Sequence, residues 1–149
     1  MNAINNMQRA FRLLLAASFC CLFFSCDKME CNDGLDGQWQ MCEWKSPEGE
    51  VVAGKEMKLY YSFQLQMMMF QRLSSSSGYL LSSFENRKGE IRVYDPIKYA
   101  GSGHDDILPM DTLAFYGVPL DGVMKVEQLS GSTLVLSSRE QGTLTFRKY

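Results

Sequence analysis

The sequence predicts an all-β domain, an eight-stranded antiparallel up-and-down barrel, which follows an N-terminal signal helix and a short tether. Three observations lead to this prediction. From residue 36 onward the chain breaks into short apolar, β-branched and aromatic runs separated by Gly, Ser, Asn and Pro. Almost no window outside the signal has a helical period. The runs recur at spacings of about ten residues, and closure of eight such strands removes the exposed edges of an open sheet.

The first 25 residues have the pattern of a secretory signal. Arg9 and Arg12 supply a basic start, and residues 13–24 form an uncharged, mostly apolar run that is too short to span a bilayer. Ser25 is a small residue directly before Cys26. The segment LFFSC, residues 22–26, resembles a bacterial lipobox, in which the cysteine becomes the lipidated first residue of the mature chain. The alternative is an ordinary signal peptide and a soluble secreted product.

The lipobox resemblance implies a lipid anchor at Cys26. Such a cysteine carries a diacylglyceryl group and usually a further acyl chain, and two or more chains hold a domain stably on a membrane that it does not span. Residues 26–34 are then a solvated tether, and the acidic residues in it resemble the surface-export signals of Bacteroidetes lipoproteins. The implied location is the bacterial outer membrane, with the periplasmic and the surface-facing sides both open.

Composition limits the partners of the mature chain. Without residues 1–25 it has 13 basic and 17 acidic side chains, a net charge of −4. Lysine and arginine are scattered singly, so no nucleic acid partner is expected. Residues 35–149 suffice for one core and one domain. Cys31 lies on the tether and Cys42 in a predicted strand, so free thiols are favoured, although an oxidising compartment leaves their pairing open.

The first four predicted strands occupy residues 37–45, 58–70, 79–85 and 90–94. The second alternates most cleanly, and one of its faces, expected to be buried, carries Tyr61, Phe63, Leu65, Met67 and Met69. A serine-rich turn at 74–78 separates the second strand from the third. A hairpin turn at 86–89, in which Gly89 can take a positive φ, leads into the fourth strand, and Asp95-Pro96 is expected to end it.

The second half of the chain supplies four more predicted strands after a long irregular segment at 97–111. The first of them covers Thr112 to Val118. A hairpin about residues 130–132 joins strands at 123–129 and 133–138, and a turn at 141–142 leads into the last strand, 143–149. The predicted number of strands is therefore eight.

The two ends of the predicted barrel carry a further pattern. Residues 35–39, LDGQW, open the first strand with a Gly-x-Trp, and Phe146-Arg147 lies in the last strand. In the lipocalin and calycin superfamily this tryptophan plugs one barrel end and stacks against a basic side chain of the final strand; Trp39 and Arg147 match those places. Over residues 35–149 the chain is similar to the lipocalin-like lipoprotein domains of Bacteroidetes, mostly uncharacterised, which implies a fold and no activity. A META-type domain, with a similar opening Gly-x-Trp, is the competing fold.

Two functions remain open, because an eight-stranded barrel is either just filled by side chains or just able to hold one small ligand. In the first, Tyr61, Phe63, Leu65, Met67 and Met69 line a cavity for a small hydrophobic or amphipathic ligand, to which flexible thioethers adapt. In the second, the barrel is packed and serves as a protein-interaction or assembly module of an envelope complex. The segments 46–57 and 97–111 are the expected specificity loops in either case.

Neither catalysis nor metal binding is expected. His104 stands beside Asp105 and Asp106, but no second histidine or further carboxylate spacing completes a coordination shell, so a solvated polar loop is favoured. The serines cluster in turns, and none lies in a Gly-x-Ser-x-Gly motif. The sequence therefore predicts no enzyme, no cofactor and no metal.

Overall fold

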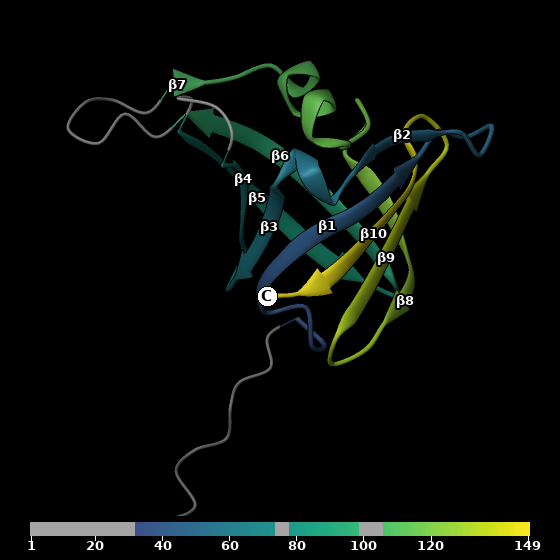
Figure 1. Ribbon diagram of the computed structural model, residues 1–149. Coiled ribbons are helices and arrows are strands. Elements are labelled where there is room, and N and C mark those ends of the chain that lie inside the picture. Colours follow the sequence, from purple (N-terminus) through teal and green to yellow (C-terminus); the bar gives the residue numbers. More distant parts are fainter. Residues whose placement is uncertain (1–31, 74–77, 99–105) are drawn as a thin grey trace, which may run out of the picture. The chain divides into compact units, whose positions relative to one another are not determined.

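The computed structural model describes residues 32–73, 78–98 and 106–149 (Figure 1). The predicted signal, Cys26, Cys31, most of the serine-rich turn and His104 lie outside these ranges. Within them, no helix is long and apolar enough to cross a bilayer.

Eight strands close into an antiparallel up-and-down barrel, which confirms the predicted fold class (Figure 1). Each strand pairs with the next barrel strand along the chain, and pairing of the first with the last closes the barrel. Two short strands, β2 (Val51–Gly54) and β7 (Asp106–Ile107), pair with the barrel without belonging to the closed ring. The eight are β1 (Gly37–Lys45), β3 (Leu59–Gln64), β4 (Met67–Arg72), β5 (Tyr79–Arg87), β6 (Glu90–Lys98), β8 (Val123–Leu129), β9 (Thr133–Ser138) and β10 (Gly142–Lys148).

The single strand predicted at 58–70 is wrong, because this segment forms the hairpin of β3 and β4. A two-residue turn, Leu65–Gln66, reverses the chain, and Gln64 pairs with Met67. Since neighbours across an antiparallel pair point to the same side, the reversal moves the inward positions from odd to even numbers. Tyr61 and Phe63 point inward on β3, whereas Met68 and Phe70 do so on β4.

The strand predicted at 112–118 is also wrong, since residues Met110–Tyr116 form the 3-10 helix η2. Its two buried side chains, Leu113 and Tyr116, are three residues apart, the repeat that places side chains on one face of such a helix. Gly117, with φ 86, ends it in the left-handed conformation that glycine adopts without strain. The number of barrel strands is still eight, because the segment predicted as one strand at 58–70 forms two and the segment predicted as a strand at 112–118 forms none.

Asp95-Pro96 does not end β6, contrary to the prediction. Ser83 pairs with Tyr94 and Leu81 with Ile97, so Asp95 and Pro96 lie together opposite one residue of β5. This is a β-bulge, a place where proline's missing N–H removes no ladder hydrogen bond. The strand therefore continues through the bulge to Lys98.

Both predicted specificity loops contain regular structure. The segment after β1 holds β2 and the 3-10 helix η1 (Lys55–Met57), and the segment after β6 holds β7 and the start of η2. The segments are thus shorter as loops than the sequence indicates.

The barrel has two distinct ends (Figure 1). We call the end with residues 32–36, the β3–β4 turn and the β8–β9 turn the tether end. We call the opposite end, with η2, β2 and β7, the helix end. The side chain of Leu35 is buried at the tether end, and the side chains of Leu113 and Tyr116, both from η2, are buried at the helix end. Apolar side chains therefore close the barrel at both ends.

Candidate functional site

The barrel interior, where a ligand cavity was one expectation, is filled by aromatic rings. The ring of Tyr61 has its centroid 5.0 Å from that of Phe70 and 4.5 Å from that of Phe146. Phe63 continues the cluster, with centroids 6.5 Å from Tyr61 and 5.2 Å from Phe84. These separations are those of close aromatic contact, and all five side chains are almost fully buried. Side chains from β3, β4, β5 and β10 thus meet in the barrel interior.

The structure brings together only two of the five residues expected to line a cavity. Tyr61 and Phe63 belong to the interior cluster. Leu65 lies in the β3–β4 turn and is 66% exposed, and Met67 is 37% exposed. Met69 is half-buried and lies between the buried Met68 and Phe70, so it points away from the interior. Leu65, Met67 and Met69 therefore lie apart from Tyr61 and Phe63, because the inward positions change from odd to even numbers at the β3–β4 turn.

One buried polar contact fixes the interior cluster to η2. The Tyr61 hydroxyl donates a hydrogen bond to the Tyr116 carbonyl oxygen, and the Phe70 and Tyr116 rings lie 5.7 Å apart. Burial raises the pKa of the Tyr61 hydroxyl above its usual range. The neutral phenol is therefore the stable form, and it satisfies its own donor and a carbonyl near the end of η2.

We expect this buried phenol to make the fold sensitive to alkali. The unfolded chain releases the Tyr61 proton near the ordinary pKa of 10.0, whereas the folded chain retains it. The contribution of this group to the free energy of unfolding is fully present below pH 10. Above pH 10 it falls by about 1.4 kcal/mol per pH unit. Tyr61→Phe should remove that slope and cost about 1 kcal/mol at neutral pH through the lost hydrogen bond. Urea unfolding of both proteins between pH 8 and about 11.5 measures this, and parallel pH profiles would contradict it.

At the tether end, the structure places Lys148 rather than Arg147 over the ring of Trp39. The Lys148 Nζ lies 4.9 Å from the ring centroid, and the Trp39 Nε1 donates to the Leu35 carbonyl oxygen at 2.7 Å. Leu144 and Phe146 point inward on β10, so Lys148 lies on the same side and Arg147 on the outer surface. Arg147 pairs with Gln40 and is exposed. The basic partner of the tryptophan is thus present one residue later than predicted.

We predict that Lys148 and Arg147 differ in their effect on stability. Lys148→Ala should lower the free energy of unfolding by about 0.5–1 kcal/mol, the usual value of a partly exposed cation–π contact. Arg147→Ala, on the exposed surface, should change it by less than about 0.5 kcal/mol. Urea denaturation followed by tryptophan fluorescence compares them, and a larger loss for Arg147→Ala would reverse the assignment.

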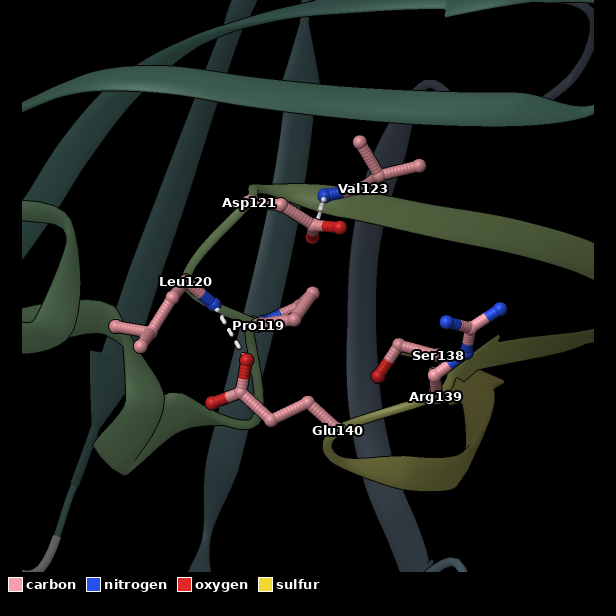
Figure 2. Close-up of a pocket in the computed structure, with 7 residues that line it drawn as sticks. All are labelled: Pro119, Leu120, Asp121, Val123, Ser138, Arg139 and Glu140. Atoms are coloured by element: carbon pink, nitrogen blue, oxygen red, sulfur yellow. Dashed lines mark hydrogen bonds between the residues drawn. The ribbon is translucent and has the colours of Figure 1, made fainter.

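Two surface cavities lie at opposite ends of the barrel. The one at the helix end has a volume of about 340 Å³, and Figure 2 shows seven of its lining residues. The Leu120 N–H donates to Glu140 Oε2 at 2.9 Å and the Val123 N–H donates to Asp121 Oδ1 at 3.0 Å, so both carboxylates satisfy backbone groups. The other, about 530 Å³, is a recess at the tether end lined by Asn32, Leu65, Gln66, Met67 and Ser83.

The helix-end cavity was not predicted from the sequence. Its residues come from 119–123 and 138–140, two segments that carry no recognisable binding motif and meet only in the folded barrel. No group of three or more His, Cys, Asp or Glu able to hold a metal occurs among the residues that the structure covers. Cys42 is a free, half-buried thiol.

The comparisons agree with the architecture. A family model described as a lipocalin-like domain matches residues 20–149. A lipocalin-like protein from Bacteroides uniformis is 26% identical with a TM-score of 0.54, over 78% of this chain and 99% of its own. A protein from Bacteroides eggerthii, described as uncharacterized, is 23% identical with a TM-score of 0.53, over 77% of this chain and 99% of its own.

A third solved structure, of a protein from Burkholderia xenovorans, is 16% identical with a TM-score of 0.50, over 77% of this chain and 83% of its own, and shows the fold alone. No curated protein matches the chain. The barrel architecture supports a small-ligand-binding or an interaction role, and the fold is typically a binding one without catalysis. With the family model matched over most of its length and the closed eight-stranded barrel, the chain belongs to the lipocalin-like domain family.

Proposed function

We propose that the protein is a lipid-anchored envelope lipoprotein whose packed barrel acts as a protein-interaction or assembly module. One observation carries the choice of module over carrier: the rings of Tyr61, Phe63, Phe70, Phe84 and Phe146 fill the barrel interior. A lipocalin-type ligand would need this space, since ligand pockets usually occupy about 300 Å³ or more. Binding functions are therefore assigned to the outer surface and the two ends.

Exposed apolar side chains at the helix end support an interaction role. Large, well-exposed apolar groups gathered at one place on a soluble domain often mark a contact surface. Most of the large exposed apolar residues among the described ones lie in β2, β7 or η2, or shortly after β4 or η2: Val51, Val52, Leu73, Ile107, Phe115 and Leu120. The Arg72 guanidinium lies 4.8 Å from the centre of the Phe115 ring, which combines an aromatic and a cation as interfaces commonly do.

The anchor part of the proposal depends on the sequence around Cys26. The basic start, the apolar run and the small residue before Cys26 support lipidation there, and hence attachment to the outer membrane of a bacterium. Metabolic labelling with a palmitate analogue should mark the wild type and leave Cys26→Ala unlabelled. Cys42→Ala is the matched control, and it should label like the wild type. Equal labelling of Cys26→Ala would refute the anchor.

Photocrosslinking in intact cells tests the interaction role. A photoreactive phenylalanine analogue is placed at Phe115 or at Leu120 of the full-length chain, and at Gln128 on the exposed wall of β8 as the control. We expect a discrete protein adduct from the two helix-end sites and none from the control. Absence of any protein adduct at all three sites would contradict the role as an interaction module.

A small-ligand role is the second candidate, and the helix-end cavity of about 340 Å³ favours it. Its volume lies at the low end of ligand pockets. Apolar Pro119, Leu120 and Val123 lie beside the charged Arg139, and Figure 2 shows the Arg139 guanidinium turned away from the Glu140 carboxylate. Such a lining suits a small amphipathic molecule. Native mass spectrometry of protein purified from its host, with Leu120→Asp as the comparison, should show a bound species that the variant lacks.

A further inference from the structure

We propose that the tether end of the barrel rests on the membrane surface, with Leu65 and Met67 in direct contact with lipid. This inference deepens the proposed function and rests on the lipid anchor at Cys26. It assigns a role to an exposed apolar pair that the fold itself does not need.

The tether is too short to hold the barrel far from the bilayer. Only five residues separate Cys26 from Asn32, the first residue that the structure describes. An extended chain spans at most about 3.3–3.6 Å per residue, so Asn32 lies within roughly 20 Å of the lipidated sulfur. Whatever the tether's conformation, the part of the barrel next to Asn32 stays close to the headgroups.

Asn32 is bound firmly to the β3–β4 turn. Its side-chain Nδ2 donates to the Leu65 carbonyl oxygen at 2.8 Å and to Asp36 Oδ1 at 2.6 Å. The Asn86 Nδ2 donates to the Asn32 carbonyl oxygen at 3.4 Å, and Asn32 is buried. The chain therefore leaves the barrel beside Leu65, which places this turn at the point of attachment.

The fold alone does not explain a leucine at position 65, in either its backbone conformation or its exposure. Its φ is 55, a left-handed conformation that glycine or asparagine adopts more readily than leucine. Its side chain is 66% exposed and contributes nothing to the core. Backbone strain of this kind is found at functional positions. Leu65 and the exposed Met67 line the recess of about 530 Å³ together with Asn32, Gln66 and Ser83, and they supply its apolar side chains.

Lipid fits this surface better than a second protein does. A protein partner would have to enter between the barrel and a bilayer that the tether keeps within reach, whereas lipid is already there. The contact is assigned to the apolar side chains of Leu65 and Met67 rather than to the basic residues of this end, of which Arg87 is paired with Glu85. We therefore expect an apolar contact that persists at high salt.

Quenching by brominated lipid tests the inference on the lipidated full-length protein. The protein is reconstituted in vesicles of phosphatidylethanolamine and phosphatidylglycerol, with or without brominated phosphatidylcholine. Leu65→Trp reports on the tether end, and Leu120→Trp at the helix end is the matched control, since Leu65 is 66% exposed and Leu120 55%. Trp39 and Trp44 are buried and give the same background in both. A residue buried about 5–10 Å into the headgroup and acyl boundary lies near the bromine. The fluorescence that the new tryptophan of Leu65→Trp adds to that of the wild type should therefore fall by about half in brominated vesicles.

The outcomes separate this inference from the proposed function. Emission of Leu120→Trp should be unchanged, and quenching of Leu65→Trp should persist in high salt. If Leu65→Trp is unquenched, or both variants are quenched equally, while intact mass shows lipid on Cys26 and the vesicles retain the protein, the membrane contact is refuted and the anchor stands. A mature protein without lipid refutes both. Should circular dichroism show that Leu65→Trp is unfolded, Met67→Trp on the same surface replaces it and is subject to the same criteria.

Discussion

Replacing Phe63 with alanine should lower the free energy of unfolding by about 3–5 kcal/mol, the usual cost of emptying a buried aromatic site. Phe63 is 1% exposed and contacts Tyr61 and Phe84, so neighbouring rings from two different strands lose their partner together. A domain of this size has a total stability of about 5–15 kcal/mol, so the loss is a large fraction of it. Urea denaturation followed by tryptophan fluorescence measures the change.

The same variant tests whether the wild-type interior is full. An apolar cavity left by a large-to-small change stays dry and can take up a small apolar molecule. Benzene should therefore raise the melting temperature of Phe63→Ala and leave that of the wild type unchanged. Leu65→Ala, two residues away on the exposed turn, is the matched control, and it should change stability by less than about 0.5 kcal/mol. Equal stabilisation of wild type and Phe63→Ala by benzene would show that the native barrel already has room, and would favour the carrier function.

Gly142→Ala should destabilise the domain by about 2–5 kcal/mol, combining left-handed backbone strain with overpacking. Gly142 has φ 75, and a Cβ there would lie 2.1 Å from the Lys45 carbonyl oxygen and 2.7 Å from the Pro47 nitrogen. These are backbone atoms, which cannot turn aside as a flexible side chain does. The clash falls where β10 starts along β1, the pairing that closes the barrel.

Gly131→Ala is the control for this prediction. Gly131 lies in the β8–β9 turn, and a Cβ there would meet no atom within 4 Å. Its substitution should change the urea midpoint little, whereas Gly142→Ala should lower the midpoint and expose β1 and β10 amides to hydrogen exchange. Similar midpoints for the two variants would show that the β1–β10 pairing tolerates the added methyl group.

The fold class was predictable because the alternation of side chains along most strands is strong. The hairpin at 130–132 and the last strand needed only period-two patterning and turn residues. The β3–β4 turn was missed because Leu65–Gln66 contains no Gly, Asn, Asp or Pro, and apolar residues continue on both sides of it. Local pattern could not show that the parity changes there. Packing of Leu113 and Tyr116 into the barrel end, a tertiary effect, likewise decided between strand and helix for η2.

The site was less predictable than the fold. The Gly-x-Trp motif identified Trp39 from the sequence. Whether Arg147 or Lys148 lies over its ring depends on which of the two points inward on β10, and that is set by the register with β1. The helix-end cavity joins segments about 20 residues apart, and the tether-end recess joins Asn32 to Leu65 and Ser83. Such neighbours are set by strand pairing, and a single sequence carries no local signal for them.

The pairing of β1 with β10 also brings both extremities of the domain to one pole. The Tyr149 N–H donates to the Gln38 carbonyl oxygen at 2.8 Å, close to where the chain enters at Asn32. Both ends of the described domain thus lie at one pole, and η2, β2 and β7 at the opposite pole only connect or flank barrel strands. Substitutions in those opposite-pole segments should therefore leave the contacts at the two chain ends unchanged, because distant and independent sites act additively.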